Sequence, residues 1–545
     1  MSTVLTPQQA NHPGLTAEPE VPLTTAENAA ARPFVNEPHL DFTRPENRRA
    51  MQHALEKIGR ELGRECENAI AGRRVRTTAK LRSINPSHPE QVVGVFQSAG
   101  PEDAAPAVEA AQSAFESWKR TSAAQRAELL FRVAHSVRQH KFEWCAWLVY
   151  EVGKNWAEAD ADISEAIDFA EFYGREAMRL DKSTPPIQYL GERDELHYIP
   201  LGVGAVIPPW NFPLAIMAGM TMAAIVTGNT VVLKPSGDAM TIAAHFFHTL
   251  EECGMPDGVV NFVTGSGSSF GEALVRHPKV RFIAFTGSKD VGLRINELAA
   301  KPQPGQIWIK RAILEMGGKN AIIVDADADL DDAVNGVVAS AFGFSGQKCS
   351  ACSRAIVDER IYEKFVERLR QRTQQLTVSG AEENPSLGPV INEGARSSIL
   401  KFIEEALRQG GRLVTGGHAV EGRDGFFIEP TVISDVKPGD TLEQKEVFGP
   451  VLAVLRCSGF NEGLRIANDT EYGLTGGVYT QSEERIEQAR RDFHVGNLYI
   501  NRKCTGAMVG AHPFGGFSMS GTDSKAGGPD YLLLFTQAKS IARKL

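Results

Sequence analysis

The sequence lacks an excess of positive charge, and this absence excludes several classes of protein. Its 545 residues include 58 Lys and Arg against 67 Asp and Glu, which gives a formal net charge of −9. An acidic chain has no general electrostatic attraction to nucleic acids or to anionic membranes. We therefore expect a partner of neither kind.

The N-terminus lacks the features of a targeting segment. No Lys or Arg precedes Arg32, whereas Glu18, Glu20 and Glu27 lie in this stretch. A secretory signal starts with a basic segment before an apolar run, and a mitochondrial transit peptide is basic and poor in acids. Residues 1–40 are rich in Pro, Thr, Ala and Glu, which predicts a loosely ordered arm wrapped over the surface.

Cysteine is scarce, and its pattern is not that of a disulfide framework. The seven cysteines are odd in number and irregularly spaced: Cys66, Cys145, Cys253, Cys349, Cys352, Cys457 and Cys504. In a long chain this usage is typical of a reducing compartment. We therefore expect a cytoplasmic protein.

The sequence also lacks an uninterrupted apolar run of membrane-spanning length. Its most apolar stretch, residues 212–233, is broken by Thr227, Gly228 and Asn229, which are typical of a turn. The pattern predicts a buried helix followed by a buried strand at residues 230–233.

Short apolar strands alternate with helices from about residue 198 onward. Strands are expected at residues 203–207, 230–233, 259–263 and 281–285, and helices at 214–226, 239–253 and 269–276. This alternation predicts parallel βαβ units with helices on both faces. Ligands of such sheets bind at the carboxyl ends of the strands.

The flanking regions have their own patterns. Upstream helices are predicted at about 48–64, 102–118, 123–140 and 158–180. A second α/β region is predicted from near residue 312 to about 513, with a strand at 321–324, helices at 330–342 and 359–376, and a polar loop near 381–395. Residues 531–535 (YLLLF) are a short strand candidate with an open edge that needs a partner.

Two glycine-containing loops follow consecutive predicted strands. The first, residues 265–271 (GSGSSFG), begins with Gly265, and the second, residues 285–292, contains Gly287 and Ser288. Glycines allow a backbone to approach a pyrophosphate at a helix N-terminus. One such loop is as consistent with a plain turn, but two in succession favour a dinucleotide site.

Two polar residues stand where predicted strands end. Lys234 is either a surface lysine at a sheet edge or a ligand for an adenosine ribose. Asn211 lies in a rigid proline-rich segment, residues 208–213 (PPWNFP), whose constraint would fix its amide as an oxyanion donor. The alternative for this segment is a turn with Trp210 in the core.

Cys349 and Glu315 form the most informative pair. A thiol can attack a carbonyl and hold it as an adduct, and a carboxylate can activate the water that releases the product. Beside a nicotinamide this pair would oxidise an aldehyde to an acid. The alternatives are a salt-bridging role for Glu315 and, for Cys349 with Cys352, a redox dithiol or half a zinc site. No second C-x-x-C or close His pair completes a metal site, so no metal is expected.

Six motifs occur in the order seen in the aldehyde dehydrogenase superfamily. They are residues 210–213 (WNFP), 234–236 (KPS), 285–288 (FTGS), 315–319 (EMGGK), 346–349 (GQKC) and 446–450 (EVFGP). The 34 residues from Glu315 to Cys349 also resemble the family spacing. The resemblance extends from about residue 40 to the end.

The C-terminal stretch is similar to one branch of that superfamily. Residues 501–507 (NRKCTGA), 513–516 (PFGG) and 520–531 resemble enzymes that oxidise L-glutamate γ-semialdehyde, formed from 1-pyrroline-5-carboxylate, to L-glutamate in proline breakdown. Longer relatives carry a fused proline dehydrogenase, for which this chain has no room, so a monofunctional enzyme is expected. The rivals are an enzyme for another acidic semialdehyde such as that of succinate, a noncatalytic protein that kept the fold, and a thioredoxin-like redox protein.

The resemblance implies an α/β fold with a Rossmann-type NAD domain, a second α/β catalytic domain and a small β flap. The implied ranges are an arm at 1–40, the NAD domain at 41–176 and 199–313, the catalytic domain at 314–513, a connector at 514–525 and an oligomerisation flap at 177–198 and 526–545. A homo-oligomer is implied, either a dimer or a dimer-based hexamer.

The resemblance also assigns roles to residues. Cys349 would be the nucleophile, Asn211 with the Cys349 backbone N–H the oxyanion donors, and Glu315 the base that activates water. The implied cofactor contacts are Trp210, Lys234, Gly265, Gly287, Ser288, Glu446 and Phe448. The implied substrate contacts are Phe212, Ser350, Gly506, Ala507 and Phe514.

NAD is the implied cofactor, but one position departs from the commoner pattern. Superfamily members often carry an acid three residues after the lysine, where this chain has Gly237 followed by Asp238. Removing an acid removes a repulsion against a 2′-phosphate. Use of NADP is therefore also compatible with the sequence.

The C-x-x-C pattern gives a first testable prediction. Cys352→Ser is expected to leave the dehydrogenase activity largely intact, because only Cys349 is needed as the nucleophile. Steady-state NADH formation checks it, and a loss of activity as large as that of Cys349→Ala would instead support a dithiol function.

Overall fold

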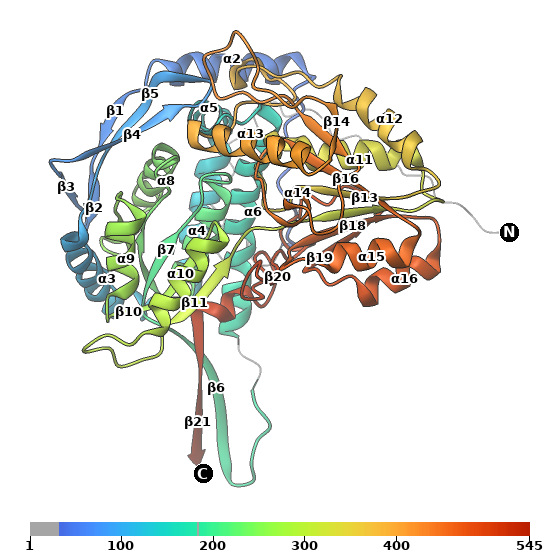
Figure 1. Ribbon diagram of the computed structural model, residues 1–545. Coiled ribbons are helices and arrows are strands. Elements are labelled where there is room, and N and C mark those ends of the chain that lie inside the picture. The colour runs from blue at the N-terminus through green and yellow to red at the C-terminus, as the bar shows by residue number, and fades with distance from the viewer. Residues whose placement is uncertain (1–31, 183–184) are drawn as a thin grey trace.

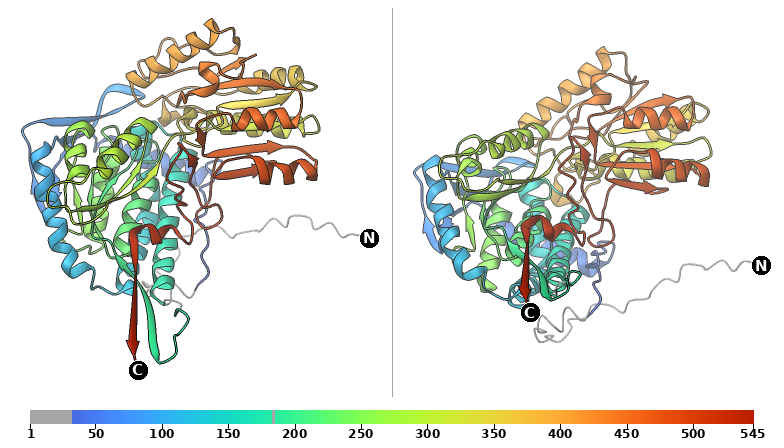
Figure 2. Two further views of the ribbon diagram at one scale, coloured as in Figure 1. Left: turned by 60° about the horizontal axis from the view of Figure 1, so that its bottom comes forward. Right: turned by 90° about the horizontal axis from the view of Figure 1, so that it is seen from below.

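The structure, a computed structural model, describes residues 32–182 and 185–545. Within these ranges the chain forms two seven-stranded sheets with helices packed around them, and a two-stranded ribbon that projects from the body (Figure 1). Figure 2 shows the two sheet-containing bodies from two further directions, with the ribbon leaving the first of them. The arm expected at residues 1–40 lies largely outside the described residues. Its described end packs along a helix through Asn36 and Glu37, which donate to Asp168.

The first sheet is mainly parallel. In spatial order its strands are β11 (Arg311–Glu315), β10 (Val280–Thr286), β7 (Val203–Ile207), β8 (Thr230–Leu233), β9 (Val260–Phe262), β2 (Asn68–Ile70) and β3 (Arg73–Val75). The pairs from β11 to β9 are parallel, whereas β2 joins β9 and β3 in antiparallel pairs. β7, β8 and β9 are almost wholly buried and mostly apolar, as expected for strands covered on both faces.

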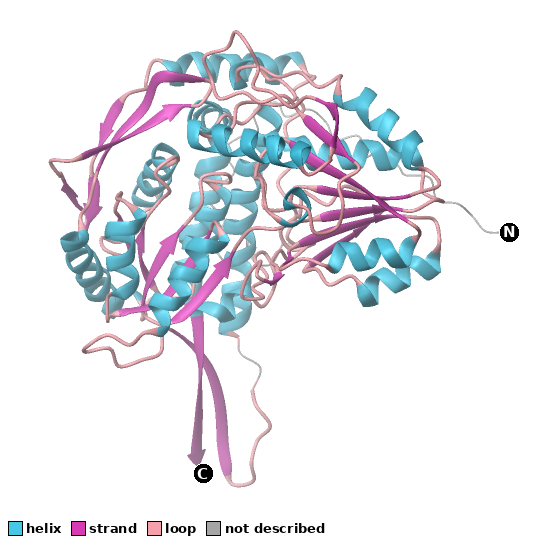
Figure 3. Cartoon of the chain, viewed as in Figure 1, coloured by secondary structure: helices cyan, strands magenta, loops and turns pink. Residues whose placement is uncertain are grey.

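Helices cover both faces of this sheet (Figure 3). One core joins it to α4 (Ala123–Gln139), α5 (Lys141–Val152), α6 (Trp156–Asp181), α7 (Ala215–Val226) and α8 (Met240–Glu252), and the other to α3 (Ala104–Trp118), α9 (Glu272–Arg276) and α10 (Lys289–Ala300). α7 is buried along nearly its whole length and leads into β8. The apolar stretch 212–233 is thus a buried helix and strand, as predicted. None of the helices in the described residues has the length and apolar character needed to cross a bilayer.

The second sheet is also mainly parallel. Its spatial order is β14 (Arg412–Thr415), β15 (Thr431–Ser434), β16 (Val451–Cys457), β13 (Arg354–Asp358), β12 (Ala321–Val324), β18 (Thr475–Tyr479) and β19 (Asn497–Ile500), and β14 alone pairs antiparallel. One core contains α11 (Leu330–Phe342) and α12 (Tyr362–Thr373), and the other contains α13 (Glu393–Arg408), α15 (Phe460–Asn468) and α16 (Glu483–Asp492). The fold is therefore α/β, as the sequence predicts.

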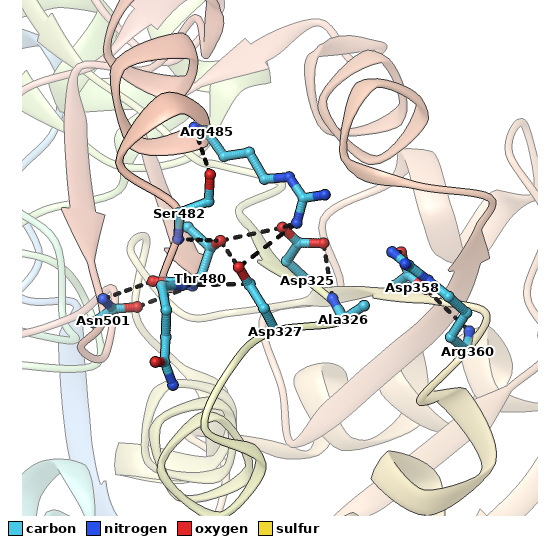
Figure 4. A network of polar contacts seen from close by, with 10 residues as sticks. Asp325, Ala326, Asp327, Asp358, Arg360, Thr480, Ser482, Arg485 and Asn501 are labelled. Atoms are coloured by element: carbon cyan, nitrogen blue, oxygen red, sulfur yellow. Dashed lines mark hydrogen bonds and ion pairs between the residues drawn. The ribbon is translucent and has the colours of Figure 1, made fainter.

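Polar side chains tie together the carboxyl ends of the second sheet (Figure 4). The Thr480 hydroxyl, after β18, lies within hydrogen-bond distance of the Asp325 carboxylate at 3.1 Å and of the Asp327 carboxylate at 2.8 Å, both of which follow β12. Arg485 pairs with Asp325, and Asn501 exchanges hydrogen bonds with the Thr480 backbone. These groups satisfy one another's hydrogen-bonding needs, so the network stabilises this edge of the sheet.

A buried ion pair between Arg354 and Glu443 holds β13 in place in the second sheet. Arg354 donates to the Glu443 carboxylate at 2.6 Å and to the carbonyls of Lys319, Ile466 and Ala467 at 3.0, 3.1 and 2.9 Å. Both charged side chains are only 1% exposed. A guanidinium with so many acceptors joins three segments that are distant in sequence.

The projecting ribbon pairs β6 (Glu192–Pro200) with β21 (Thr536–Lys544). The two strands are antiparallel over their full length, from Thr536 opposite Pro200 to Lys544 opposite Glu192. Within the described residues neither strand has a second neighbour. Both long edges of the ribbon are therefore open and present unpaired backbone groups. The assignment of the flap to oligomerisation stays a prediction.

The prediction of a strand at residues 531–535 is wrong. These residues form a 3₁₀ helix, η5 (Tyr531–Phe535), and the terminal strand β21 begins immediately after it. Tyr531, Leu532 and Phe535 are buried, and Tyr531 stacks on Tyr173 with ring centroids 5.6 Å apart. The apolar run anchors the tail in the first core. Its composition alone does not distinguish a buried 3₁₀ helix from a strand.

Two further expectations need correction. The helix predicted at 48–64 is α2 (Pro45–Gly59), and it ends before β1 (Arg64–Cys66), which pairs with β5 (His88–Gln97) beside β4 (Lys80–Asn85) in a three-stranded sheet that was not predicted. The second α/β region was placed from near residue 312, but residues 311–315 form β11, which pairs with β10 of the first sheet. The expected boundaries at 176/177, 198/199 and 313/314 thus fall inside α6, β6 and β11.

The buried pair gives a prediction for stability. Arg354→Ala is expected to lower the free energy of unfolding by about 3–5 kcal/mol, because it leaves the Glu443 carboxylate buried without its partner. Urea unfolding followed by fluorescence measures the change. Arg370→Ala is the matched control, since the Arg370 pair with Glu367 lies at the surface and should contribute only about 0–1 kcal/mol. Equal effects of the two substitutions would contradict the expectation.

Candidate active site

The candidate residues gather where one edge of each sheet meets the other. Residues 210–212, Lys234, Gly265, Gly287 and Glu315 lie at or just after the carboxyl ends of β7, β8, β9, β10 and β11. Cys349 and Glu446 instead precede β13 and β16, at the amino edge of the second sheet. The carboxyl edge of the first sheet therefore faces the amino edge of the second.

Cys349 lies in a tightly constrained loop after α11. Phe344 and Ser345 adopt positive φ angles of 49° and 53°, and Gly346 follows at 69°. A Cβ on Gly346 would lie 2.2 Å from the Gly449 carbonyl oxygen. Such backbone strain persists only where the surroundings fix it, and it is common at functional sites.

The loop is pinned from both sides of the interface. The Asn320 amide donates to the carbonyls of Cys349 at 2.7 Å and Ala351 at 2.9 Å. From the first sheet, the buried Asn211 amide donates to the Gln347 carbonyl at 3.0 Å. The amide of Asn211 therefore lies against the loop that carries the thiol.

The Cys349 thiol is half-buried in an acidic environment. Burial raises its pKa, and the charges of Glu315, Glu446 and Glu165 raise it further. The thiol of the free chain is thus held in its protonated form at neutral pH. A reaction that uses the thiolate must first remove the proton from the thiol.

Glu315 ends β11 with its carboxylate turned into the protein. Its two oxygens accept hydrogen bonds from the Gly516 backbone N–H at 3.0 Å and the Ser524 hydroxyl at 3.2 Å. Burial raises the pKa of Glu315 well above its usual value, and these hydrogen bonds oppose that shift. A carboxyl with a raised pKa suits the transfer of a proton near neutral pH.

Lys234 is a buried lysine at the end of β8. It is 5% exposed, and its ammonium donates to the Pro235 carbonyl at 2.9 Å. Burial lowers its pKa to about 8. A Cβ on Gly271, in the first glycine loop, would lie 3.5 Å from its side chain. The surface-lysine alternative is therefore excluded, and a dinucleotide entering this edge would meet a cation with donors to spare.

The glycine loops open at the same edge. Ser288 is exposed and caps the N-terminus of α10 by accepting from the Val291 N–H at 3.4 Å. A Cβ on Gly287 would lie 2.5 Å from the Phe285 ring, and one on Gly265 would lie 2.9 Å from the Ala99 carbonyl oxygen. Packing alone thus requires glycine at both positions, and the helix N-terminus supplies the feature that favours an anion.

Glu446 reaches the same junction from the second sheet. Its carboxylate accepts the Gly318 backbone N–H at 3.0 Å, and burial raises its pKa to about 7. A Cβ on Gly317 would lie 2.1 Å from one of its oxygens. Phe448, at a φ of 56°, lies edge-on to Trp210 with ring centroids 5.5 Å apart. An acid and an aromatic ring therefore converge near the thiol loop.

The predicted anchor loop lies against the thiol loop. The Cys504 thiol and the Thr475 hydroxyl donate to the Ser350 carbonyl at 3.4 and 3.2 Å. Gly506 adopts a φ of 76°, which favours glycine, and Arg502 donates to its carbonyl at 3.2 Å. The structure thus brings Ser350 close to the segment that contains Gly506 and Ala507.

Phe212 and Phe514, the two aromatic residues predicted to contact the substrate, have different surroundings. The Phe212 ring lies 3.9 Å from the ammonium of Lys154, which is fully buried and paired with Asp162 at 2.9 Å. Phe514 is half-buried, and its backbone pairs with Ala526. The Phe212 ring is therefore fixed by a cation on its face.

The sequence reasoning missed an acidic stripe on α6. Glu158 pairs with Lys348, beside Cys349, at 2.6 Å, and Asp162 holds Lys154. Burial raises the pKa of Glu165 to about 8, and this carboxyl accepts no hydrogen bond from the described residues. The three acids recur at i, i+4 and i+7 on one helix face. That spacing was visible in the sequence, and the charge of Glu165 is one of the causes that raise the pKa of the Cys349 thiol.

The Cys352 thiol has its own partner, which is not Cys349. It is buried, and its thiol donates to the Arg354 carbonyl at 3.4 Å. Within residues 32–182 and 185–545 no group of three or more His, Cys, Asp or Glu side chains is arranged to hold a metal ion. The geometry gives the two cysteines of the C-x-x-C pattern separate surroundings.

Comparison with known proteins decides the family. The sequence pattern of the aldehyde dehydrogenase family matches residues 74–541. The chain belongs to the aldehyde dehydrogenase family. It is 54% identical over 512 residues to the 1-pyrroline-5-carboxylate dehydrogenase of Geobacillus thermodenitrificans, covering 94% of this chain and 99% of that protein. The second such enzyme of Bacillus subtilis is 52% identical over 511 residues, with the same coverage.

Solved structures of family members are closely similar. A Thermus 1-pyrroline-5-carboxylate dehydrogenase with bound NAD is 50% identical, with a TM-score of 0.93 over 94% of this chain and 99% of that one. Proline utilization A from Bdellovibrio bacteriovorus is 44% identical, with a TM-score of 0.92 over 97% of this chain and 54% of that longer one. The family resemblance read from the motifs is therefore confirmed.

The crowding at Gly317 gives a prediction for the site. Gly317→Ala is expected to displace the Glu446 carboxylate from the Gly318 N–H and so from the cofactor contact that the family resemblance implies for it, which should raise the KM for NAD about tenfold, the effect of losing one hydrogen bond to a charged group. Steady-state kinetics with varied NAD measure it, with thermal unfolding as the check on folding. An unchanged KM for NAD in a folded variant would remove Glu446 from the cofactor site.

Proposed function

We propose that the chain is an NAD-dependent aldehyde dehydrogenase that oxidises L-glutamate γ-semialdehyde, formed from 1-pyrroline-5-carboxylate, to L-glutamate in proline catabolism. The observation that carries the proposal is the placement of the Cys349 loop and the Glu315 carboxylate at one junction of two sheet edges. The relatives named above, at about half identity over nearly the whole chain, support the same reaction.

The junction fits a dinucleotide. The carboxyl ends of β8, β9 and β10 present a buried lysine, Lys234, and an exposed helix N-terminus at Ser288, which suit an adenosine ribose and a pyrophosphate. Trp210, Gly265 and Gly287 complete the proposed site, and Glu446 with Phe448 would hold the nicotinamide ribose and ring. Bound NAD supplies the hydride acceptor.

Cys349 is the proposed nucleophile. Its thiolate attacks the aldehyde carbon and forms a thiohemiacetal, whose oxyanion accepts hydrogen bonds from the Asn211 amide and the Cys349 backbone N–H. Loss of hydride leaves a thioester on Cys349. Glu315 then takes a proton from the water that attacks the thioester, which releases the acid and the thiol.

The anchor loop sets the proposed substrate class. The backbone N–H groups of Gly506 and Ala507, with the Ser350 hydroxyl, would bind the α-carboxylate, since fixed donors suit an anion. Phe212 and Phe514 would enclose the aliphatic stem. The contact of the Ser350 carbonyl with the Cys504 thiol supports this arrangement, because it joins the anchor loop to the thiol loop.

The surroundings of Gly237 support NADP as a second cofactor. A Cβ at Gly237 would meet nothing within 4 Å, so the position next to the proposed ribose site is open. The neighbouring Asp238 accepts a hydrogen bond from Asn392 at 3.3 Å. Its carboxylate is thereby directed toward the second sheet rather than left free to repel a 2′-phosphate.

The projecting ribbon supports a homo-oligomer, either a dimer or a dimer-based hexamer. Ile187 and Leu190, in the loop before β6, are 98% and 95% exposed, and both ribbon edges are open. A second copy of the chain would cover them. The proposed location is the cytoplasm, which the seven free cysteines support.

The test is NADH formation from 1-pyrroline-5-carboxylate by the wild type and by Cys349→Ala. Turnover is expected in the first and none in the second, with NAD binding retained, because only the nucleophile is lost. Cys253→Ala, which removes a half-buried thiol outside the junction, is the control and should keep its activity. Turnover by Cys349→Ala, or a substantially faster reaction of the wild type with succinate semialdehyde, would contradict the proposal.

A further inference from the structure

The connector, residues 514–525, wraps around the end of β11. The Met316 N–H donates to the Ser520 carbonyl at 2.7 Å, and the Thr522 N–H donates to the Leu314 carbonyl at 2.9 Å. The Thr522 hydroxyl also accepts from the Leu314 N–H at 3.0 Å. The connector is therefore paired with both neighbours of Glu315 in the strand.

This pairing places the connector against the Glu315 carboxylate itself. One oxygen accepts the Gly516 N–H at 3.0 Å and the other accepts the Ser524 hydroxyl at 3.2 Å. Glycines line the same side, since a Cβ on Gly515 would lie 3.1 Å from the carboxylate and one on Gly521 would lie 3.4 Å from it. Ser524 is the one connector side chain that donates to this group, and it is only 4% exposed.

We propose that Ser524 is a positioning residue for the hydrolysis step, whose hydroxyl donates to the Glu315 carboxylate, favours its ionised form and orients it to activate water. The inference rests on the proposed function, in which Glu315 is the base. It goes beyond that function because it assigns a role to a residue of the connector. Ser524 acts through Glu315 and does not itself contact the reacting atoms.

The titratable groups around Glu315 come from three elements. Cys349 faces it from the thiol loop, Asp523 and Lys525 from the connector, and Tyr531 from η5. Lys525 lowers the pKa of Glu315 and Asp523 raises it, so these two neighbouring charges oppose each other. The two hydrogen bonds are then the main counterweight to burial, which raises the pKa.

Lys525 fixes the geometry of the other donor. Its ammonium donates to the carbonyls of Gly496 at 2.7 Å and Gly515 at 2.6 Å. Gly515 precedes Gly516, so this contact holds the segment that presents the second donor to Glu315. The Ser524 hydroxyl is the part of this arrangement that a substitution can remove without altering the backbone.

The experiment separates hydride transfer from hydrolysis in the full-length enzyme. Stopped-flow NADH traces with 1-pyrroline-5-carboxylate give a first turnover and then a steady state, and both are recorded from low to high pH. In Ser524→Ala the first turnover is expected to be unchanged. The low-pH limb of the steady state should move up by about one pH unit, the size of one hydrogen bond to a carboxylate.

The direction of the shift follows from the chemistry. Losing the hydroxyl raises the pKa of Glu315, so the carboxyl stays protonated to higher pH and cannot accept a proton from water. Below the shifted limb the steady-state rate should therefore fall about tenfold for one unit. Ser524→Thr keeps the hydroxyl, so its low-pH limb is expected to lie where the wild-type limb lies. A purely structural role for Ser524 would not require this recovery.

Thr522→Val is the matched control. It removes a hydroxyl from the same connector that bonds to the Leu314 backbone and not to the carboxylate, so its pH limb should match that of the wild type. A wild-type limb in Ser524→Ala, or an equal shift in Thr522→Val, would overturn the inference.

Glu315→Gln separates a failure of the proposed role of Glu315 from a failure of the proposed role of Ser524. A first turnover without steady-state hydrolysis supports Glu315 as the base, and the result for Ser524→Ala then decides the inference alone. Wild-type hydrolysis by Glu315→Gln would instead refute the proposed role of Glu315, and the inference would fall with it.

Discussion

The meeting of two sheet edges is the constraint on which the rest of the structure depends. The first sheet presents the carboxyl ends of its strands, and the second presents the amino ends of β12, β13 and β16. Asn211 from one body and Asn320 from the other both donate to the backbone of the thiol loop. Because two amides from different sheets fix the same loop, the positions of the thiol and of the residues after β7 are set together.

Burial of charge is the second feature that organises the junction. Burial raises the pKa values of Cys349, Glu315 and Glu446 and lowers that of Lys234. Glu446 and Lys234, with pKa values of about 7 and about 8, are therefore held near the point where they change protonation state at neutral pH, whereas burial favours the neutral thiol of Cys349. The polar network at the far edge of the second sheet is different, since its charges are mutually paired and serve to hold strands.

Much of the central fold was readable from local pattern. The strands at 203–207, 230–233 and 321–324 and the helix at 330–342 were predicted with their observed bounds, because strongly apolar runs between turn residues leave little choice. Strands β1 to β5 were missed, since β1, β2 and β3 have only three residues each and the longer β4 and β5 are partly exposed and lack a continuous apolar run. The run 531–535 was wrongly taken for a strand, because its burial depends on Tyr173 in a distant helix.

By itself the sequence determined the chemistry. Six ordered motifs specified the family, and a thiol, an amide and two carboxyls at fixed spacings named the candidate residues. Only the tertiary structure decided which other residues surround them. The stripe of Glu158, Asp162 and Glu165, the Lys154 ammonium over Phe212, and the Ser524 hydroxyl on Glu315 join segments up to 209 residues apart. Local sequence fixes periodicity and turns, whereas burial and the partners of a charge are properties of the packed chain.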